Sequence, residues 1–369
     1  MRIVQIIDSL EPGGAERMAV NYANALSKKT EFSGLVSTRK KGVLLEEIDE
    51  KVSFLFLRKT KKIDIKSIFK LKAYLKKNRI DVIHAHSSSF FLAILIKLVL
   101  PKIMIIWHDH YGISQDLSAR KNLSLKIGSL FFAGVISVNL NLKNWAKSYL
   151  FCSNIIYFPN FIDESLKTDE KLSLKGSEDK RIVCVANLRP QKNHELLIEA
   201  ANLIKGKYPD WTFHVFGKDF EDDYSNRVRK SIEDLKLEKA IFFYGTTNNV
   251  SSALKQSDIA VLPSLSEGLP LALLEYGFHK LPVISTNVGQ VSSVITSDKV
   301  GIVIESQNLK QLVIAIEKLI LDQKYREELG LALYNEVKSN FSEEKIIEDY
   351  FLWLNSFIPN ALSLKKTTK

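Results

Sequence analysis

The chain has 369 residues, of which 46% are hydrophobic and 25% charged, as in ordinary soluble globular proteins. This length predicts two domains, each large enough for its own core. The two cysteines, Cys152 and Cys184, form no disulfide framework or metal-type spacing, which favours a reducing, cytoplasmic location. The longest apolar run, Phe90–Leu100, contains Lys97 and is too short to span a bilayer. It predicts a buried helix, and the strand-like start of the chain predicts no secretion signal.

Positive charge is concentrated in the first part of the chain. Residues 1–150 carry 25 Lys and Arg against 12 Asp and Glu, whereas the remainder carries 27 against 30. The densest stretch, Arg58–Lys62, precedes a helical pattern, Ile65–Lys77, with one apolar and one cationic face. Two interpretations stay open. The cationic face is either simply solvated, or it docks on an anionic membrane, where each Lys or Arg contributes about 1 kcal/mol.

Strand-like apolar runs alternate with helical patterns along the whole chain, which predicts an α/β fold with parallel sheets covered by helices. The expected strands are residues 2–7, 34–38, 53–57, 80–84, 103–107, 134–138 and 155–157, then 181–186, 212–216, 240–244, 258–262, 282–285 and 301–304. Helical patterns follow at 308–322, 324–339 and 343–357. The polar stretch 162–180 is the expected linker between domains 1–161 and 181–342, and residues 343–369 form a last helix and tail.

Chemically useful residues follow several of these strands or, as His84 does, end one of them. In the first half they are Gly13, Gly14, His84 and His108, and in the second half Arg189, Lys192 and Glu267. Ligands of open parallel sheets bind beyond the carboxyl ends of the strands, so all of these residues fall on binding edges. Two such edges facing each other would form an interdomain cleft.

The segment Glu267–Glu275 carries the strongest functional signal. Pro270 is placed as a first helical residue, with Glu267 at the mouth of the helix and Glu275 inside it. The N–H groups of Gly268, Leu269 and Leu271 at the start of this helix would attract phosphate. Helix capping alone could explain Glu267, but not Glu275, whose sequence neighbours are apolar. A phosphate flanked by two hydroxyl-seeking carboxylates describes a nucleotide sugar.

Two more groups could hold an anion. Gly13 and Gly14 begin a helix after a strand, although the third glycine of a dinucleotide fingerprint is absent. Arg189 and Lys192 could neutralise a departing nucleoside diphosphate in place of a metal ion. The alternatives are a tight turn for the glycines and ordinary surface charge for the cations.

The order and spacing of these motifs, over about residues 1 to 300, resemble family 4 of the retaining GT-B glycosyltransferases. The resemblance implies two Rossmann-like doubly wound domains with an interdomain cleft, and a terminal helix that crosses back to the first domain. It also implies that Glu275 binds the ribose, Glu267 the sugar hydroxyls, and His108 the transferred sugar. The glycine that usually precedes the Arg is absent, and Asn187 stands in that region.

The resemblance implies a transferase that moves a sugar from a UDP- or GDP-type donor to a saccharide or lipid-linked saccharide in cell-envelope or capsular polysaccharide biosynthesis. Retention of configuration and independence of metal ions are expected, with no nucleic-acid partner and with peripheral contact to the cytoplasmic face of a membrane. Further candidates on the acceptor side are Asp8, Glu11, Glu16, Asp109, His110 and Tyr111.

Three other functions stay open. His84 and His86, with His108, Asp109 and His110, could form the metal site of a hydrolase, although no carboxylate cluster has ligand spacing. A sugar-nucleotide epimerase or a phosphorylase would use the same donor half. Net charge alone suggests a nucleic-acid-binding module, but the basic stretch lacks interleaved aromatic residues.

Overall fold

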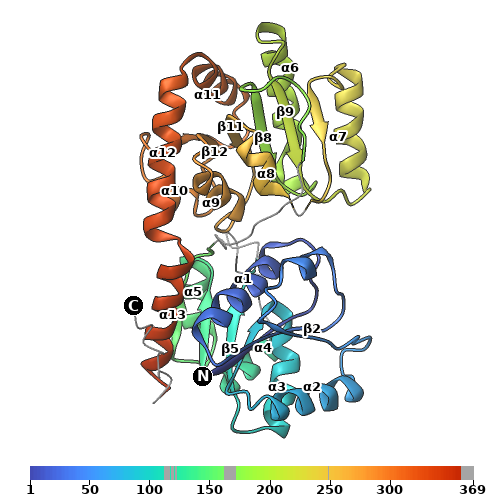
Figure 1. The fold of residues 1–369 in the computed structure, drawn as a ribbon, viewed down its shortest axis with the longest axis vertical. Helices are drawn as coiled ribbons and strands as arrows, with labels where there is room; N and C mark the ends of the chain where they lie inside the picture. The colour runs from blue at the N-terminus through green and yellow to red at the C-terminus, as the bar shows by residue number, and fades with distance from the viewer. Residues whose placement is uncertain (112–116, 118–119, 121–122, 162–171, 248, 359–369) are drawn as a thin grey trace. The chain divides into compact units, whose positions relative to one another are not determined.

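The computed structural model describes residues 1–111, 117, 120, 123–161, 172–247 and 249–358. The chain divides into two compact units, one formed by residues 1–166 with 343–369 and the other by residues 167–342. Each unit is a parallel sheet with helices packed against it (Figure 1). Of the predicted linker 162–180, residues 162–171 lie outside the described part of the chain.

The first unit contains a seven-stranded parallel sheet with the order β3-β2-β1-β4-β5-β6-β7. The strand order reverses next to β1, so the carboxyl ends of β1 and β4 stand at a topological switch point, where open α/β sheets bind their ligands. The strands are β1 (Arg2–Ile7), β2 (Phe32–Ser37), β3 (Ser53–Phe56), β4 (Val82–His86), β5 (Met104–Asp109), β6 (Gly134–Ser137) and β7 (Ile155–Tyr157).

The described helices of this unit are α1 (Gly14–Lys29), α2 (Ile65–Lys77), α3 (Phe90–Val99), α4 (Leu123–Gly128), α5 (Leu140–Tyr149) and α13 (Glu343–Asn355), with short 3-10 turns η1 (Val43–Glu47), η2 (Ser87–Ser89) and η3 (Ser129–Phe131). The prediction that the apolar run at 90–100 is a buried helix is only half correct. Phe90 and Ile96 of α3 are buried, but Leu98 is 62% exposed. The run is longer than the stripe that one helix face can bury.

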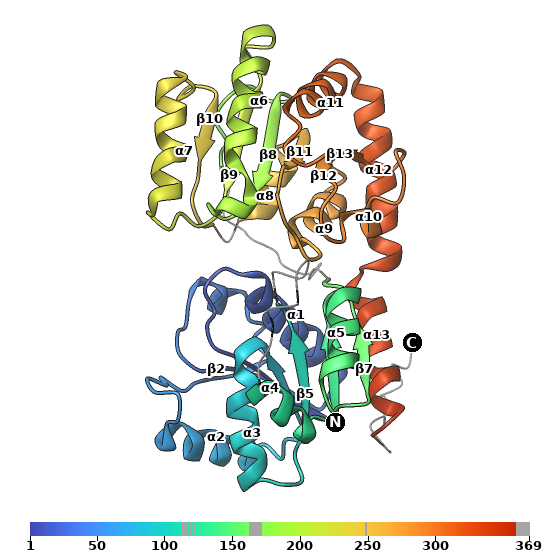
Figure 2. The ribbon, with the colours of Figure 1, turned by 180° about the vertical axis from the view of Figure 1, so that it is seen from behind.

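The helix α13 lies alongside α5 and β7 (Figure 2). Aromatic residues attach it to the sheet of the first unit. Tyr350 is fully buried, and its hydroxyl lies 3.5 Å from Nδ1 of His84. The indole of Trp353 covers Gly134, where an added Cβ would stand 2.6 Å from the ring. Residues 343–358 therefore contribute to the core of a sheet formed by the start of the chain.

The second unit contains a six-stranded parallel sheet with the order β10-β9-β8-β11-β12-β13. The strands are β8 (Arg181–Val185), β9 (Thr212–Phe216), β10 (Ile241–Phe243), β11 (Ile259–Leu262), β12 (Val283–Thr286) and β13 (Ile302–Ile304). The helices are α6 (His194–Lys207), α7 (Asp223–Asp234), α8 (Val250–Lys255), α9 (Leu271–Phe278), α10 (Val291–Val294), α11 (Leu309–Leu321) and α12 (Gln323–Asn340), with the turn η4 (Pro190–Lys192).

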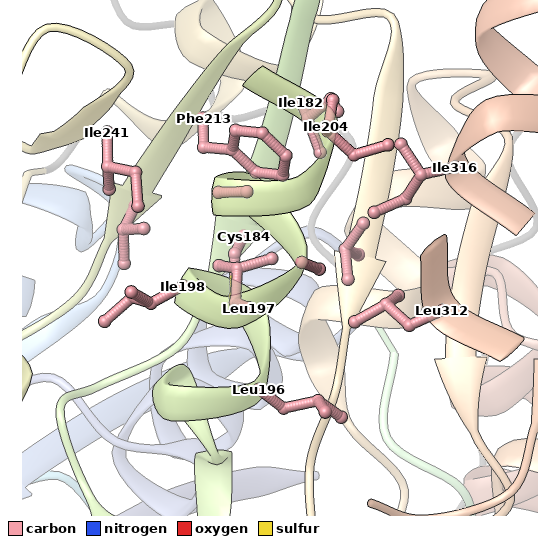
Figure 3. Packing of buried hydrophobic residues seen from close by; sticks show 14 of the residues in the cluster. Ile182, Cys184, Leu196, Leu197, Ile198, Ile204, Phe213, Ile241, Leu312 and Ile316 are labelled. Atoms are coloured by element: carbon pink, nitrogen blue, oxygen red, sulfur yellow. The ribbon is translucent and has the colours of Figure 1, made fainter. Parts of the chain in front are cut away.

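The core of the second unit lies between its sheet and the helices α6 and α11 (Figure 3). Ile204 of α6 lies near Phe213 of β9, Leu197 lies near Cys184, and Ile316 of α11 belongs to the same cluster. Cys184 lies inside it, where burial raises the pKa of its thiol to about 12, so this cysteine is an inert packing group. None of the helices described in either unit is long and apolar enough to cross a bilayer.

Candidate active site

Lys192 and Glu267, which are 75 residues apart in the sequence, form an ion pair. The Lys192 ammonium lies 2.6 Å from Oε1 of Glu267, and the Ser264 hydroxyl donates to the same oxygen at 2.7 Å. Glu267 is only 7% exposed. Lys192 follows β8 and Glu267 follows β11, and these strands are neighbours, so their carboxyl ends bring the two side chains together.

A glycine turn after β12 supports the loop that carries Glu267. Gly289 has a φ of +59°, and a Cβ at this position would overlap the carbonyl oxygen of Glu267. The backbone N–H of Gln290 donates to the carbonyl of Gly268 at 2.9 Å. The Thr286 hydroxyl donates to the carbonyl of Ser264 at 2.6 Å. The backbone around Glu267 is therefore fixed from two sides.

The helix after Glu267 begins one residue later than predicted. Pro270 is extended, with φ −73° and ψ 123°, and forms the N-cap of α9 rather than its first residue. The backbone N–H groups of Leu271 and Ala272, in the first turn of α9, have no acceptor within the helix itself. Leu269 is buried. Glu275 is the fifth residue of α9 and half-buried.

Arg189 follows β8 in the same loop as Lys192. Its guanidinium lies 4.6 Å from the centre of the Phe220 ring, and in the described part of the chain it forms no ion pair with a carboxylate. A guanidinium that stacks on an aromatic ring keeps its donors available. The loop after β8 therefore presents one uncompensated cation, Arg189, and one cation paired with Glu267.

The sequence lacks the glycine that usually precedes the Arg, but a glycine after the neighbouring strand β9 lies against this loop. Gly217, after β9, has a φ of +155°, and a Cβ there would overlap the carbonyl oxygen of Ala186. The side chain of Asn187 accepts a hydrogen bond from the N–H of Lys218 at 2.7 Å. The loops after β8 and β9 can therefore approach each other closely because residue 217 is glycine, and the hydrogen bond between Lys218 and Asn187 holds them together.

Gly13 and Gly14 begin α1, as predicted, but neither adopts a conformation that only glycine allows. Gly13 is the N-cap with φ −170°, and nothing lies within 4 Å of a Cβ built on Gly14. The start of the helix is covered by the side chain of Glu16, whose carboxylate oxygen a Cβ on Gly13 would overlap, so a ligand that approaches this backbone must displace Glu16.

The histidines of the first unit lie inside the sheet, because two strands end two residues later than predicted. The expectation that His84 ends the fourth strand and His108 follows the fifth is wrong. β4 continues through His86 and β5 through Asp109, since His86 pairs with His108 in the parallel ladder. Nε2 of His84 lies 3.1 Å from Nδ1 of His108. His108 is 1% exposed, and its Nε2 has no hydrogen-bond partner among the described residues.

The arrangement of the rings does not suit a metal ion. Ligand nitrogens of His84, His86 and His108 lie within 4.8 Å of one another. However, the ring of His84 stacks on those of His86 and His108 with interplanar angles of 16° and 17°. Parallel rings cannot direct their nitrogens to one tetrahedral centre, and these nitrogens already bond to one another, to His110 and to Gln5.

Asp109 cannot serve as a free carboxylate on the acceptor side. Arg120 binds both of its oxygens, at 2.6 and 2.7 Å, and stacks over Trp145 and Tyr111 at 4.3 Å. Burial raises the pKa of Asp109, although Arg120 opposes the shift. This clamp was not predicted, because nothing in the sequence connects Arg120 to Asp109.

Acid should destabilise the first unit. Burial lowers the pKa of His84 and of His110 to about 3, so both rings are neutral when folded. Below pH 6.5 the unfolded chain binds protons that the folded chain does not. Stability should therefore fall with pH, by about 1.4 kcal/mol per ring between pH 7.5 and 5.5. In the variant Trp211→Phe all remaining tryptophans belong to the first unit. Urea unfolding of this variant, followed by tryptophan fluorescence at both pH values, measures the unfolding free energy of that unit. An unfolding free energy equal at both pH values would contradict it.

Comparison with known proteins identifies the family. Residues 167–335 match the model of "Glycosyl transferases group 1" and residues 12–166 that of "Glycosyltransferase Family 4". The chain is 26% identical to the UDP-Gal:α-D-GlcNAc-diphosphoundecaprenol α-1,3-galactosyltransferase of Escherichia coli, over 91% of this chain and 92% of that one. It is 24% identical to the capsular polysaccharide biosynthesis glycosyltransferase CapH of Staphylococcus aureus, over 80% and 83%.

Solved structures show the same fold. Anabaena HepE in complex with UDP and glucose superposes with a TM-score of 0.80 at 16% identity, covering 96% of this chain and 100% of that one. A glycosyltransferase from Rickettsia africae gives 0.74 at 19% identity, covering 98% and 99%. The predicted fold of two Rossmann-like parallel-sheet units is confirmed, and the two family matches together span residues 12–335. The chain therefore belongs to the GT-B glycosyltransferases of family 4.

Proposed function

We propose that this glycosyltransferase moves a sugar from a UDP- or GDP-type donor to a saccharide or lipid-linked saccharide of the cell envelope. The relatives support this proposal, because one is named for a UDP-galactose donor and a lipid diphosphate acceptor and another for capsular polysaccharide biosynthesis. The observation that carries it is the Lys192–Glu267 pair, which stands beside the first turn of α9 at the carboxyl edge of the second sheet.

In the proposed reaction the second unit binds the donor. Arg189, Lys192 and the first-turn amides of α9 neutralise the diphosphate as its bond to the sugar carbon breaks. Glu267 binds the sugar hydroxyls, and Glu275 binds the ribose. The acceptor hydroxyl attacks the same face of the sugar that the diphosphate leaves, and its proton passes to the leaving phosphate, so configuration is retained. For the first unit we propose that Nε2 of His108, which has no hydrogen-bond partner among the described residues, binds a sugar hydroxyl.

No metal ion is needed in this proposal. Two fixed cations and the amide dipoles supply the positive charge that a divalent ion would otherwise supply. Glu267 is engaged by Lys192 and Ser264, which leaves it poorly suited to hold such an ion.

We also propose that α2 brings the enzyme to an anionic membrane as a peripheral protein. Ile65 and Phe69 are 66% and 63% exposed on the same side of this helix as Lys66 and Lys70. Apolar side chains flanked by lysines suit the boundary between headgroups and acyl chains.

Phe69→Ser tests the membrane proposal. It should lower binding to vesicles that contain phosphatidylglycerol about 10-fold, because one large apolar side chain contributes roughly 1.5–3 kcal/mol when it leaves water. Phe151→Ser is the matched control, since Phe151 is also exposed but lies away from α2 in the sequence. Equal binding of both variants and the wild type would refute the role of α2.

The function itself is tested by a donor screen that follows release of the nucleoside diphosphate, with and without membrane-extracted acceptors and with and without EDTA. We expect release that depends on the acceptor, persists in EDTA and yields a product with the donor's anomeric configuration. A product formed from the donor alone would instead favour an epimerase or a hydrolase.

A further inference from the structure

Lys59 is a largely covered lysine whose ammonium, at the edge of the sheet, has no counterion among the described residues. The residue is 8% exposed, and in the described chain its ammonium forms neither a hydrogen bond nor an ion pair with a side chain. The charges that influence it are Asp8, Arg39 and Asp64, none of which is within ion-pair distance. Burial lowers the pKa of Lys59 because desolvation disfavours its charged form.

The backbone holds Lys59 at the binding edge of the first sheet. The N–H of Lys59 donates to the carbonyl of Thr38 at 2.7 Å, which continues the β2–β3 pairing past the ends of both strands. The N–H of Arg39 donates to the carbonyl of Asp8 at 2.8 Å in the same way. Asp8, Arg39 and Lys59 therefore follow β1, β2 and β3 on one edge of the sheet.

The nearby carboxylates are already engaged. Asp8 accepts hydrogen bonds from the hydroxyls of Thr38 and Ser88, and its oxygen stands 3.9 Å from Nε of Arg39. Asp64 caps α2 by accepting from the N–H of Ser67 at 3.0 Å. The segments 37–41 and 57–64 carry seven Lys and Arg residues, against the carboxylates of Asp8, Glu11 and Asp64. This edge of the sheet thus keeps a net positive charge.

A cation that loses part of its hydration without gaining a partner lowers stability. An anionic ligand that binds beside Arg39 would give Lys59 its missing partner. Arg and Lys together are the side chains that bind phosphate oxygens.

We propose that Lys59 and Arg39 bind the phosphate group of a phosphorylated acceptor, the group through which an acceptor saccharide is joined to its lipid. This inference rests on the proposed transferase function and specifies its acceptor. The geometry fits such a molecule, because α2, with its exposed Ile65 and Phe69, begins six residues after Lys59. The lipid of the acceptor and the apolar side chains of α2 would then enter the same membrane.

Binding of hexyl diphosphate measured by calorimetry, with UDP in excess to occupy the donor half, tests the site without turnover. Lys59→Gln and Arg39→Gln should each weaken binding about 10-fold or more, the expected loss for a charge-assisted hydrogen bond. Lys102→Gln, an equal charge change at the opposite edge of the sheet, should bind like the wild type. Equal binding by all variants, or no binding by the wild type, would overturn the proposal.

Kinetics separates this proposal from the transferase function. In Lys59→Gln the KM for a phosphorylated acceptor in detergent should rise about 10-fold, whereas the KM values for the nucleotide sugar and for an alkyl glycoside acceptor stay unchanged. A similar rise with the alkyl glycoside would refute a phosphate site, and so would a loss confined to vesicle binding. No turnover by the wild type with any acceptor would instead refute the transferase function.

Stability gives a third readout. Because Lys59 has no partner in the described structure, Lys59→Met should melt at the same temperature as the wild type or above it. A large fall in Tm would show that Lys59 is structural, contrary to the proposal.

Discussion

Lys192→Gln should lower kcat by at least about 100-fold, because it removes one of the two charges that stabilise the leaving diphosphate. Glutamine is one bond shorter than lysine, so its amide reaches Oε1 of Glu267, now 2.6 Å from the lysine ammonium, only after a small shift of the loop. Steady-state kinetics with the donor found in the screen measures the loss, and Tm should change little.

Two further variants serve as controls for Lys192→Gln. Lys299→Gln, an exposed lysine of the same unit before β13, should keep full activity. Lys192→Arg should recover only part of the activity, since a planar guanidinium is longer and differently shaped than an ammonium. Activity of Lys192→Gln close to that of the wild type would remove Lys192 from the site.

Gly289→Ala should lower kcat about 100-fold without touching any ligand. A left-handed conformation costs a non-glycine residue roughly 1–2 kcal/mol, and the new Cβ would overlap the carbonyl oxygen of Glu267. The Glu267 loop must move, and displacing a catalytic group by about 1 Å can cost 100-fold in rate. Thermal unfolding and kinetics of the same preparation measure both effects.

Gly206→Ala is the matched control. Gly206 lies inside α6, where a Cβ would have nothing within 4 Å, so alanine should raise stability by roughly 0.5–1 kcal/mol and leave kcat unchanged. A fully active Gly289→Ala would show that the turn after β12 does not position Glu267.

The architecture could be predicted because its signals are local. Apolar runs bounded by turns placed the described strands to within two residues, since the central runs are buried on both faces of a parallel sheet. The ends of β4 and β5 were misplaced because they depend on pairing between His86 and His108, not on either segment alone.

The contacts around the site could not be predicted. Nothing in the sequence links Lys192 to Glu267, or Gly289 to the carbonyl that it accommodates, because strand order brings them together. The run Arg58–Lys62 illustrates the same limit. Its sequence does not distinguish its members, yet Arg58 is exposed whereas Lys59 is only 8% exposed.

The central claim is that fixed cations and the first turn of α9 hold the diphosphate of a nucleotide sugar. A crystal structure of the protein soaked with UDP tests it most directly. We expect the phosphates beside Arg189 and Lys192 and the ribose beside Glu275. UDP bound elsewhere, away from Arg189 and Glu275, would contradict the claim.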